Sequence, residues 1–226
     1  MPRGEYDRGE RKAQTRAALL SAAARVYARR GFAGATLDEV AAEAGFSKGA
    51  VYAHFGSKEK LLLALLAEHL AARISEQIAL FDRDVTTWER PLRGSERWMK
   101  RLDEDPDAFR LFVELWCYAQ RDERLRAGVG EGLDLLRATF AGFAEAGAAD
   151  AGIDGSAAVA EAFAETSVAL GIGLSMIKLV DSETKPSALL GTVLGLLIRS
   201  LEDSPQARAK LEQAGVRSAA RARSAV

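Results

Sequence analysis

The sequence predicts an all-α protein. Apolar residues recur with a helical period along most of the 226 residues, and runs in which Val, Ile or Thr alternate with polar residues do not occur. Alanine, leucine, arginine and glutamate, which are strong helix formers, dominate the composition. The length allows one or two domains with a sizeable core.

The first two predicted helices are marked by their ends. The first covers residues 14–30 and stops at Gly31, which accepts the left-handed backbone conformation found at helix C-termini. Thr36 and Glu39 have the spacing of a capping box, in which each side chain accepts a hydrogen bond from the other residue's backbone. The capping box begins a short second helix that ends at Gly45.

Two serines mark the next helix starts. Ser47 caps a third helix that runs through about His54, and Ser57 caps a long fourth helix that runs to about Phe81. Residues 83–94 are expected to form a loop. The later helices are expected at residues 95–104, 106–119, 123–147, 156–180 and 186–202.

These elements predict four segments. They are a flexible basic arm at 1–14, a three-helix domain at 15–60, a larger helical domain at 61–203 and a loose basic tail at 204–226. In the tail we expect at most one helical turn, near residues 207–213. Residues 1–60 carry 11 Lys and Arg against 7 Asp and Glu, whereas residues 61–203 carry 15 against 24. A basic start on an acidic body suits an anionic partner such as DNA, although solvation alone accounts for it equally well.

Residues 36–54 have the pattern of a helix-turn-helix. Ala41 is small where two helices cross, Gly45 permits a tight turn, and Val51 is apolar where the second helix rests on the first. The alternative is an ordinary helical hairpin in a bundle core. The outward residues of the second helix favour the helix-turn-helix, because all of them can approach phosphates or base edges: Lys48, Gly49, Ala50, Tyr52 and His54. Lys58 and Lys60 add possible phosphate contacts beside the start of the fourth helix.

The stretch from residue 36 to residue 62 closely resembles the DNA-binding domain of the TetR/AcrR family of transcriptional regulators, and the resemblance extends over residues 15–65. It implies that Thr36 caps the second helix beside a phosphate and that Lys58 binds a phosphate. It also implies that Ser47, Lys48, Gly49 and Ala50 begin the recognition helix and that Tyr52 and His54 contact the DNA backbone and bases. Ala53 is smaller than the residue often found there in the family, so we expect no base contact from it.

An apolar stripe on residues 106–119 predicts either core packing or the wall of a pocket for an apolar or aromatic ligand. The predicted ligand-binding residues are Trp98, Leu102, Phe109, Phe112, Val113, Trp116, Phe140, Phe143 and Met176. Glu114 lies on another stripe of the same helix with Arg110 and is expected to form an outward ion pair.

The last two long helices are apolar on nearly every face, which predicts a second partner besides their own core. We expect a twofold homodimer that pairs these helices in a four-helix bundle, as the resembled family does. The predicted interface residues are Phe163, Leu170, Leu190, Gly191, Leu194, Gly195, Leu197 and Ile198.

The sequence gives little support to other classes of protein, such as metalloproteins, enzymes or membrane proteins. The single cysteine, Cys117, excludes an intrachain disulfide, and the two histidines, His54 and His69, have no zinc-site spacing, so we expect no metal and no cofactor. No catalytic or nucleotide-binding motif occurs, so we expect no enzyme. The charge-free stretches 166–177 and 186–198 are shorter than the roughly 20 residues of a membrane span. With no secretory signal at the N-terminus, we expect a cytoplasmic protein.

Together these observations predict an all-α homodimer with an N-terminal three-helix helix-turn-helix domain and a C-terminal helical domain for ligand binding and dimerisation. It is expected to bind a near-palindromic double-stranded DNA operator and to be released by a small apolar or aromatic effector. Repression is what the resemblance implies. The alternative is a helix-turn-helix DNA-binding regulator without a small-molecule effector.

Overall fold

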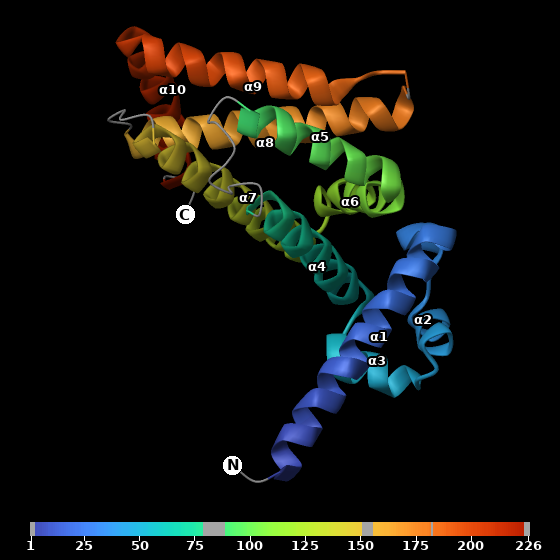
Figure 1. The fold of residues 1–226 in the computed structure, drawn as a ribbon. Coiled ribbons are helices and arrows are strands. Elements are labelled where there is room, and N and C mark those ends of the chain that lie inside the picture. Colours follow the sequence, from blue (N-terminus) through green and yellow to red (C-terminus); the bar gives the residue numbers. More distant parts are fainter. Residues whose placement is uncertain (1–2, 79–88, 151–155, 182, 224–226) are drawn as a thin grey trace. The chain divides into compact units, whose positions relative to one another are not determined.

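The computed structural model describes residues 3–78, 89–150, 156–181 and 183–223 (Figure 1). These residues form ten helices and no strand, which confirms the all-α prediction. The helices are α1 (Arg3–Gly34), α2 (Leu37–Ala44), α3 (Lys48–Phe55), α4 (Lys58–Ile78), α5 (Glu89–Glu104), α6 (Pro106–Ala119), α7 (Glu123–Asp150), α8 (Ala157–Val180), α9 (Pro186–Asp203) and α10 (Pro205–Arg223).

Both ends of the chain are more helical than predicted. α1 begins at Arg3, so residues 3–14 of the predicted flexible arm are helical. This segment has no apolar stripe, but its Glu, Lys and Arg residues are good helix formers. Gly31 interrupts the helix with φ 66° and ψ 171°, so its φ is positive, as predicted, while its ψ lies outside the left-handed helical region.

The prediction of a loose tail is wrong, because α10 occupies most of residues 204–226. Ser204 begins this helix: its Oγ accepts a hydrogen bond from the Ala207 N–H at 3.2 Å, and Pro205 follows at the first helical position. The Arg208 guanidinium donates to the carbonyls of Leu201 and Glu202 at 2.5 and 3.1 Å, which holds the corner between α9 and α10. α10 also packs against α8.

The predicted loop at 83–94 is also partly wrong. α5 begins at Glu89, so residues 89–94 are helical, and Pro91 lies in the first turn, where a proline removes no helical hydrogen bond. Residues 83–88 lie outside the described residues. The predicted bounds of 106–119 agree with α6 to the residue, because Asp105 caps the helix and Pro106 opens it.

The chain forms two compact units whose boundaries differ from the predicted ones. Unit 1 contains residues 1–72 and 105–130, and unit 2 contains residues 73–104 and 131–226. The prediction placed α6 in the ligand domain, whereas the structure places it with the N-terminal helices. α4 and α7 each begin in unit 1 and end in unit 2.

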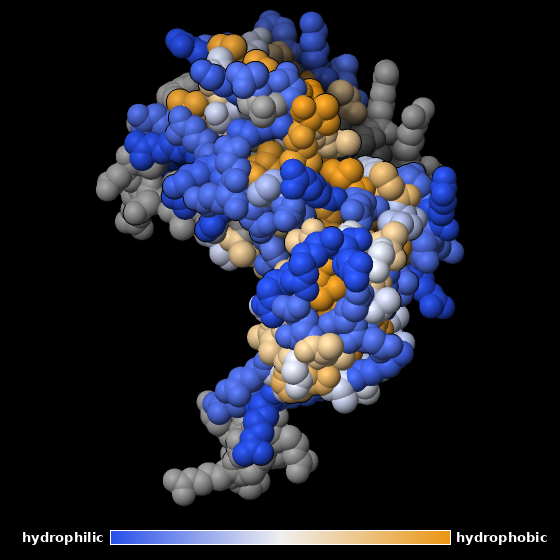
Figure 2. All heavy atoms as spheres, turned by 90° about the vertical axis from the view of Figure 1, so that its right-hand side faces the viewer, coloured by the Kyte–Doolittle hydropathy of each residue, from blue (hydrophilic) through white to orange (hydrophobic). Residues whose placement is uncertain are grey.

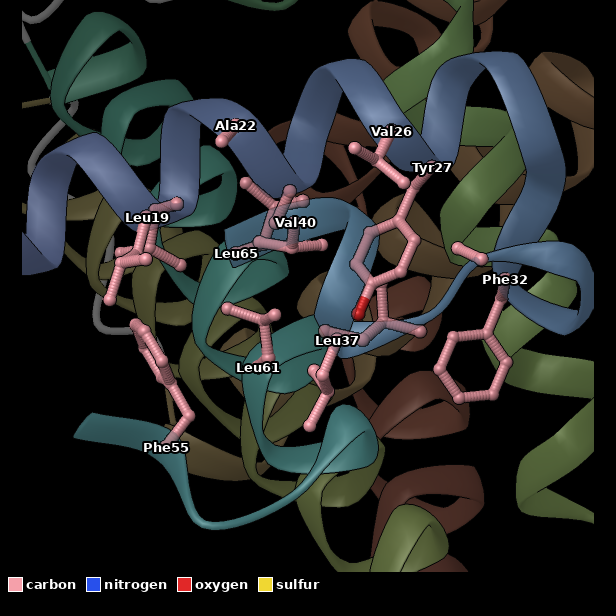
Figure 3. Close-up of a cluster of buried hydrophobic side chains, with 14 of the residues drawn as sticks. Leu19, Ala22, Val26, Tyr27, Phe32, Leu37, Val40, Phe55, Leu61 and Leu65 are labelled. Atoms are coloured by element: carbon pink, nitrogen blue, oxygen red, sulfur yellow. The ribbon is translucent and has the colours of Figure 1, made fainter. Parts of the chain in front are cut away.

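Unit 1 has a closely filled core (Figure 3). Side chains from its first four helices converge there: Leu19, Ala22, Val26, Tyr27, Phe32, Leu37, Val40, Phe55, Leu61 and Leu65. α6 adds Leu111, Leu115 and Ala119, and α7 adds Leu125. The buried Tyr27 hydroxyl donates to the Lys58 carbonyl at 3.3 Å, and burial raises the pKa of this phenol. α6 is therefore part of the body that supports α2 and α3.

Unit 2 is a bundle in which α5 lies along α9 and α8 packs on both α9 and α10. Gly191 of α9 allows the closest approach: a Cβ placed on it would lie 2.6 Å from the Leu92 Cα of α5. No larger residue fits there without a shift of backbone. The predicted close packing of a helix at Gly191 is confirmed. The helix that packs there is α5 of the same chain and not a helix of a second copy.

α8 is long and apolar enough to cross a membrane by length and composition, with a mean hydropathy of 1.5 in its most apolar window. A buried helix in the core of a protein can have the same length and composition. Ala160, Phe163, Ala164, Ser167, Val168, Gly171 and Ser175 of α8 are buried within unit 2. Charged residues near both ends of α8 limit its charge-free stretch to residues 166–177, which is why that stretch by itself predicts no membrane span.

Candidate nucleic-acid interface and ligand cavity

The capping box that begins α2 is present as predicted. Thr36 Oγ1 accepts a hydrogen bond from the Glu39 N–H at 3.2 Å, and a Glu39 carboxylate oxygen accepts from the Thr36 N–H at 2.9 Å. The carboxylate accepts a second bond from the Thr36 hydroxyl at 3.0 Å, and the two bonds that it accepts from Thr36, with the nearby Arg30, lower the pKa of the Glu39 carboxyl. The carboxylate therefore stays ionised, and the start of α2 is fixed.

The turn between α2 and α3 also has the predicted geometry. Gly45 has φ 73° and ψ 26°, and the Phe46 N–H reaches back to the Ala41 carbonyl at 2.9 Å. Ser47 Oγ then accepts from the Ala50 N–H at 3.2 Å and caps α3. Val51 is completely buried and rests on the core beneath α2. The two helices thus form a helix-turn-helix.

The outward face of α3 is accessible. Ser47, Lys48, Gly49 and Tyr52 are exposed, while Ala50 and His54 are half-buried. Tyr52 shows 48% of its surface. Lys48 pairs with Asp38 of α2 at 2.9 Å, and this carboxylate raises the pKa of the Lys48 ammonium. Ser47 thus caps α3, and the other five predicted residues lie along it outside the buried side formed by Val51 and Phe55; their contact with DNA stays a prediction.

Arginines of α1 brace the helix-turn-helix. Arg25 and Arg29 both pair with Glu43 of α2, at 2.8 and 2.6 Å, and they lower the pKa of the Glu43 carboxyl. Arg30 pairs with Glu39 at 3.0 Å. Each pair is solvent-exposed and worth little alone, but together the three pairs fix α2 against α1.

A contact between α6 and the end of α1 was not predicted from the sequence. A Glu114 carboxylate oxygen of α6 accepts from the Phe32 N–H at 2.6 Å, just after the positive-φ Gly31. The predicted outward pairing of Glu114 with Arg110 is wrong, because Arg110 pairs with Asp107 at 2.6 Å instead. The Tyr118 ring packs edge-on against Phe32, with 5.1 Å between ring centroids. α6 therefore fixes the corner from which the chain enters α2.

Lys58, which the resemblance assigns to a phosphate, has internal partners in unit 1. Its Nζ donates to the Ala33 carbonyl at 3.2 Å and lies 4.6 Å from the centre of the Phe32 ring. Partial burial lowers the pKa of this ammonium group. The phosphate contact stays a prediction, and Lys58 also supports the corner at Phe32.

Unit 2 contains a cavity of about 340 Å³. Of the nine predicted ligand-binding residues, Trp98, Phe140 and Phe143 line it. Leu102 is buried away from this lining and Met176 is exposed, so neither of them lines this cavity. Phe109, Phe112, Val113 and Trp116 are not lining residues either, since they belong to α6 in unit 1. α6 packs in the core of unit 1 through Leu111, Leu115 and Ala119, which are not part of the predicted stripe, whereas Trp116 of that stripe is exposed.

The lining residues that sequence reasoning missed lie on α8 and α9. Phe163, Leu190, Leu194 and Ile198 were predicted to form a dimer interface, but they line the cavity. Because these helices are apolar nearly all round, no pattern in the sequence separates their inward face from their outward one.

The outward apolar face of α8 and α9 consists of other residues. Those that expose more than a third of their surface are Met176, Ile177, Val180, Leu189, Val193 and Leu196. Figure 2 shows hydrophobic residues that reach the surface in this way among hydrophilic ones. Of the predicted interface residues, Gly191 is also buried inside unit 2, whereas Leu170, Gly195 and Leu197 are half-buried. Four of the predicted interface residues therefore face the interior of unit 2, and the position of a dimer interface stays a prediction.

Among the described residues, no group of three or more His, Cys, Asp or Glu side chains is arranged to hold a metal ion.

The capped α2–α3 pair, its exposed helix start and the separate helical unit together define a helix-turn-helix regulator of two units.

Comparison with known proteins gives the family. The family profile described as "Bacterial regulatory proteins, tetR family" matches residues 19–65. The transcriptional repressor AcnR of Corynebacterium glutamicum is 39% identical over 137 residues, which are 56% of this chain and 70% of that protein. The chain belongs to the TetR family of helix-turn-helix transcriptional regulators.

Two further relatives bear on the rest of the chain. The transcriptional activator FasR of Mycolicibacterium smegmatis is 33% identical over 115 residues, 50% of this chain and about half (52%) of its own length. A solved transcriptional regulator from Saccharomonospora viridis, in complex with choline, has a TM-score of 0.64 at 23% identity and covers 83% of this chain and 96% of its own. This structural similarity shows that the chain has the same fold as that regulator over most of its length.

Proposed function

We propose that this protein is a homodimeric repressor that binds a near-palindromic DNA operator and leaves it when a small apolar molecule enters the cavity of unit 2. The observation that carries the proposal is the exposed start of α3, which two caps and a filled core hold in place. A short helix presented in this way inserts its first turn into a major groove.

Each residue at the start of α3 has a role in the proposal. Ser47, Lys48, Gly49 and Ala50 face the groove, and Gly49 has no side chain to keep the backbone away from the DNA. Tyr52 and His54 contact the sugar-phosphate backbone and base edges. Thr36 lies at the N-terminus of α2, where exposed amides and the helix dipole favour a phosphate.

The affinity for DNA tests this interface. Lys48→Ala is expected to weaken binding to all sequences about equally and to lower the slope of log affinity against log salt by about one, because one phosphate contact is lost. Lys100→Ala is the matched control, since it removes an exposed positive charge from unit 2. If the salt slope of Lys48→Ala equals that of Lys100→Ala, Lys48 does not contact phosphate.

The second part of the proposal is the dimer. The outward face of α8 and α9 follows helical spacing in both helices, with Leu189, Val193 and Leu196 on α9 and Met176, Ile177 and Val180 on α8. A continuous apolar surface of this kind on a regulator favours a partner, and a second copy gives the twofold symmetry that a palindromic operator requires.

Light scattering after gel filtration tests the dimer. Leu196→Glu is expected to give a monomer with much weaker operator binding, because a charge would be buried in the interface. Leu135→Glu on α7 is the control, because Leu135 is similarly exposed (49% against 62%) but lies outside this face. If Leu196→Glu remains a dimer, the interface lies elsewhere.

The cavity supports an effector over the alternative of a regulator without one. Its volume falls in the range of small-molecule sites, and aromatic and aliphatic side chains dominate its lining. α4 and α7 both continue from unit 2 into unit 1, so a ligand that favours one arrangement of these helices couples to the operator-binding surface. A coupling of about 1–3 kcal/mol is usual, which corresponds to a change of about 5- to 150-fold in operator affinity.

The sign of regulation is tested with a reporter gene behind the operator. Relatives include an activator and a repressor, and we propose repression. Deletion of the gene for this protein is then expected to raise reporter expression, and a fall in expression would overturn repression.

A further inference from the structure

The cavity of unit 2 is elongated along its helices. Its lining extends along α8 from Ser156 to Ile172 and along α9 from Leu190 to Glu202. At 1.5 Å of rise per residue these stretches span about 24 and 18 Å. A volume of about 340 Å³ spread over this length describes a narrow space that fits a chain better than a compact ring system.

One end of the cavity is lined without free polar groups. At this end, which we call the Trp98 end, the lining includes Trp98 and Gly171. The Trp98 Nε1–H donates to the buried Ser175 Oγ at 2.8 Å, and this hydroxyl donates to the Gly171 carbonyl at 2.7 Å. Ser175 itself is not a lining residue, and the two buried serines that are, Ser95 and Ser167, each donate to a backbone carbonyl of their own helix.

No buried side-chain nitrogen or oxygen of the described residues lacks a hydrogen-bond partner. A carboxylate or another acceptor group of a ligand would lose its hydrogen bonds with water at the Trp98 end, because the indole and hydroxyl protons there are already donated within the protein. The Trp98 end therefore favours hydrocarbon.

Three of the four charged lining residues lie toward the opposite end, and the fourth, Arg90, lies in the first turn of α5, about two helical turns before Trp98. Glu145 lies near the end of α7, Glu202 near the end of α9 and Arg208 in the first turn of α10, and all three line the cavity. We call this the corner end, because Arg208 there bonds the last carbonyls of α9. It offers both donors and acceptors to a polar group.

We infer that the cavity binds a single-chain amphiphile, with its hydrocarbon tail toward Trp98 and its polar head at the corner end. This inference rests on the proposed ligand site and specifies the chemical class of the effector. The polarity of the lining sets the direction of the ligand, and the length of the cavity selects for chain length.

Fluorescence quenching tests the direction. In a Trp88→Phe, Trp116→Phe background, Trp98 is the only remaining tryptophan. Dodecanoate brominated at its methyl end is expected to quench Trp98 strongly, because bromine quenches only at short range. Dodecanoate brominated beside the carboxylate is expected to quench it weakly. Equal quenching by the two probes, or the reverse order, would overturn the inference.

A cavity-filling variant tests the position of the tail. Gly171 is buried, and a Cβ built on it meets no atom within 4 Å, so a side chain there has open space to occupy. Gly171→Phe is expected to weaken dodecanoate binding by about tenfold or more, as expected when two or more methylenes can no longer be buried. Gly142→Phe is the matched control, because Gly142 is an exposed helical glycine with equally open surroundings outside the lining.

Unchanged dodecanoate binding by folded Gly171→Phe would overturn the tail position. If that variant does not fold, a chain-length series on the parent protein decides. Affinity is expected to rise about fourfold per methylene from hexanoate until the cavity is filled, and a flat series would overturn the inference.

Operator affinity, measured with the same probes, separates this inference from the proposed function. Methyl-end quenching without a change in operator affinity would support the amphiphile site and overturn its role as an effector site. Loss of operator binding on addition of dodecanoate, without methyl-end quenching of Trp98, would overturn the inferred orientation and leave the regulatory proposal standing.

Discussion

The two units of this protein use buried apolar surface in opposite ways. Unit 1 packs side chains of α1 to α4, α6 and α7 into one filled core, and its outward residues are held by caps and ion pairs. Unit 2 leaves a cavity between its helices and an apolar face on α8 and α9. A filled core suits a surface whose shape must not change, and a hollow one suits a bundle that accommodates a ligand. The predictions below test this contrast.

The largest expected effect separates the filled core from the hollow one. Leu61→Ala removes a completely buried side chain from unit 1 and is expected to cost about 2–5 kcal/mol of unfolding free energy. Leu194→Ala, at a residue that is equally apolar but lines the cavity, is expected to cost less, because its side chain already faces empty space on one side. Urea unfolding measures both variants. If both variants lose the same unfolding free energy, Leu194 is packed as tightly as Leu61 and the cavity is filled in solution.

The next effect concerns the support that α6 gives to α1. Glu114→Ala leaves the Phe32 N–H without its partner and is expected to cost about 1–3 kcal/mol. Glu114→Gln keeps an acceptor oxygen and is expected to recover part of the loss. Operator affinity is expected to follow the same order. An alanine variant as stable as the glutamine variant would show that the bond to Phe32 contributes nothing.

A smaller effect is expected at the cap of α2. Thr36→Ala removes the acceptor for the Glu39 N–H and is expected to cost about 0.5–2 kcal/mol by thermal unfolding. Thr36→Ser keeps the hydroxyl and is the control. If alanine and serine behave alike, the cap does not determine the stability of α2.

The smallest effect is expected at the Lys48–Asp38 pair. Asp38→Asn releases Lys48 and removes a negative charge beside the proposed interface, so non-specific DNA binding is expected to strengthen by up to about fivefold, as for an exposed ion pair. The gain is expected to disappear at high salt, where exposed charges are screened. Binding that stays the same at low salt would show that Asp38 does not compete with phosphate.

Features carried by a few neighbouring residues could be predicted from the sequence. Thr36 and Glu39, Gly45, and Ser47 each act within four residues along the chain, and all four have the expected geometry. The helix-turn-helix and the exposed face of α3 follow from them. The helical tail was not predicted, although Ser204 and Pro205 mark a helix start. The reason is that α10 lacks the large apolar cluster that indicates a packed helix.

Features that join distant residues could not be predicted in this way. Glu114 meets Phe32 across 82 positions of sequence, and nothing in the spacing of α6 distinguishes such a contact from an outward ion pair. Gly191 indicated close packing without indicating Leu92 as its partner. On α8 and α9, which are apolar on both sides, Leu194 and Leu196 differ only in which neighbour each meets after folding.

The discontinuity of unit 1 has a consequence for biosynthesis. Residues 73–104 are an insertion between two parts of one folding unit, and the second part supplies Leu111, Leu115, Ala119 and Leu125 to its core. A ribosome that has released only the first 72 residues has made the whole helix-turn-helix but not the side chains that complete its core. Because domains fold as units during synthesis, we expect the surface of α2 and α3 to become stable only after residue 130 has left the exit tunnel. A chimaera joined at residue 72 would separate this surface from its own support.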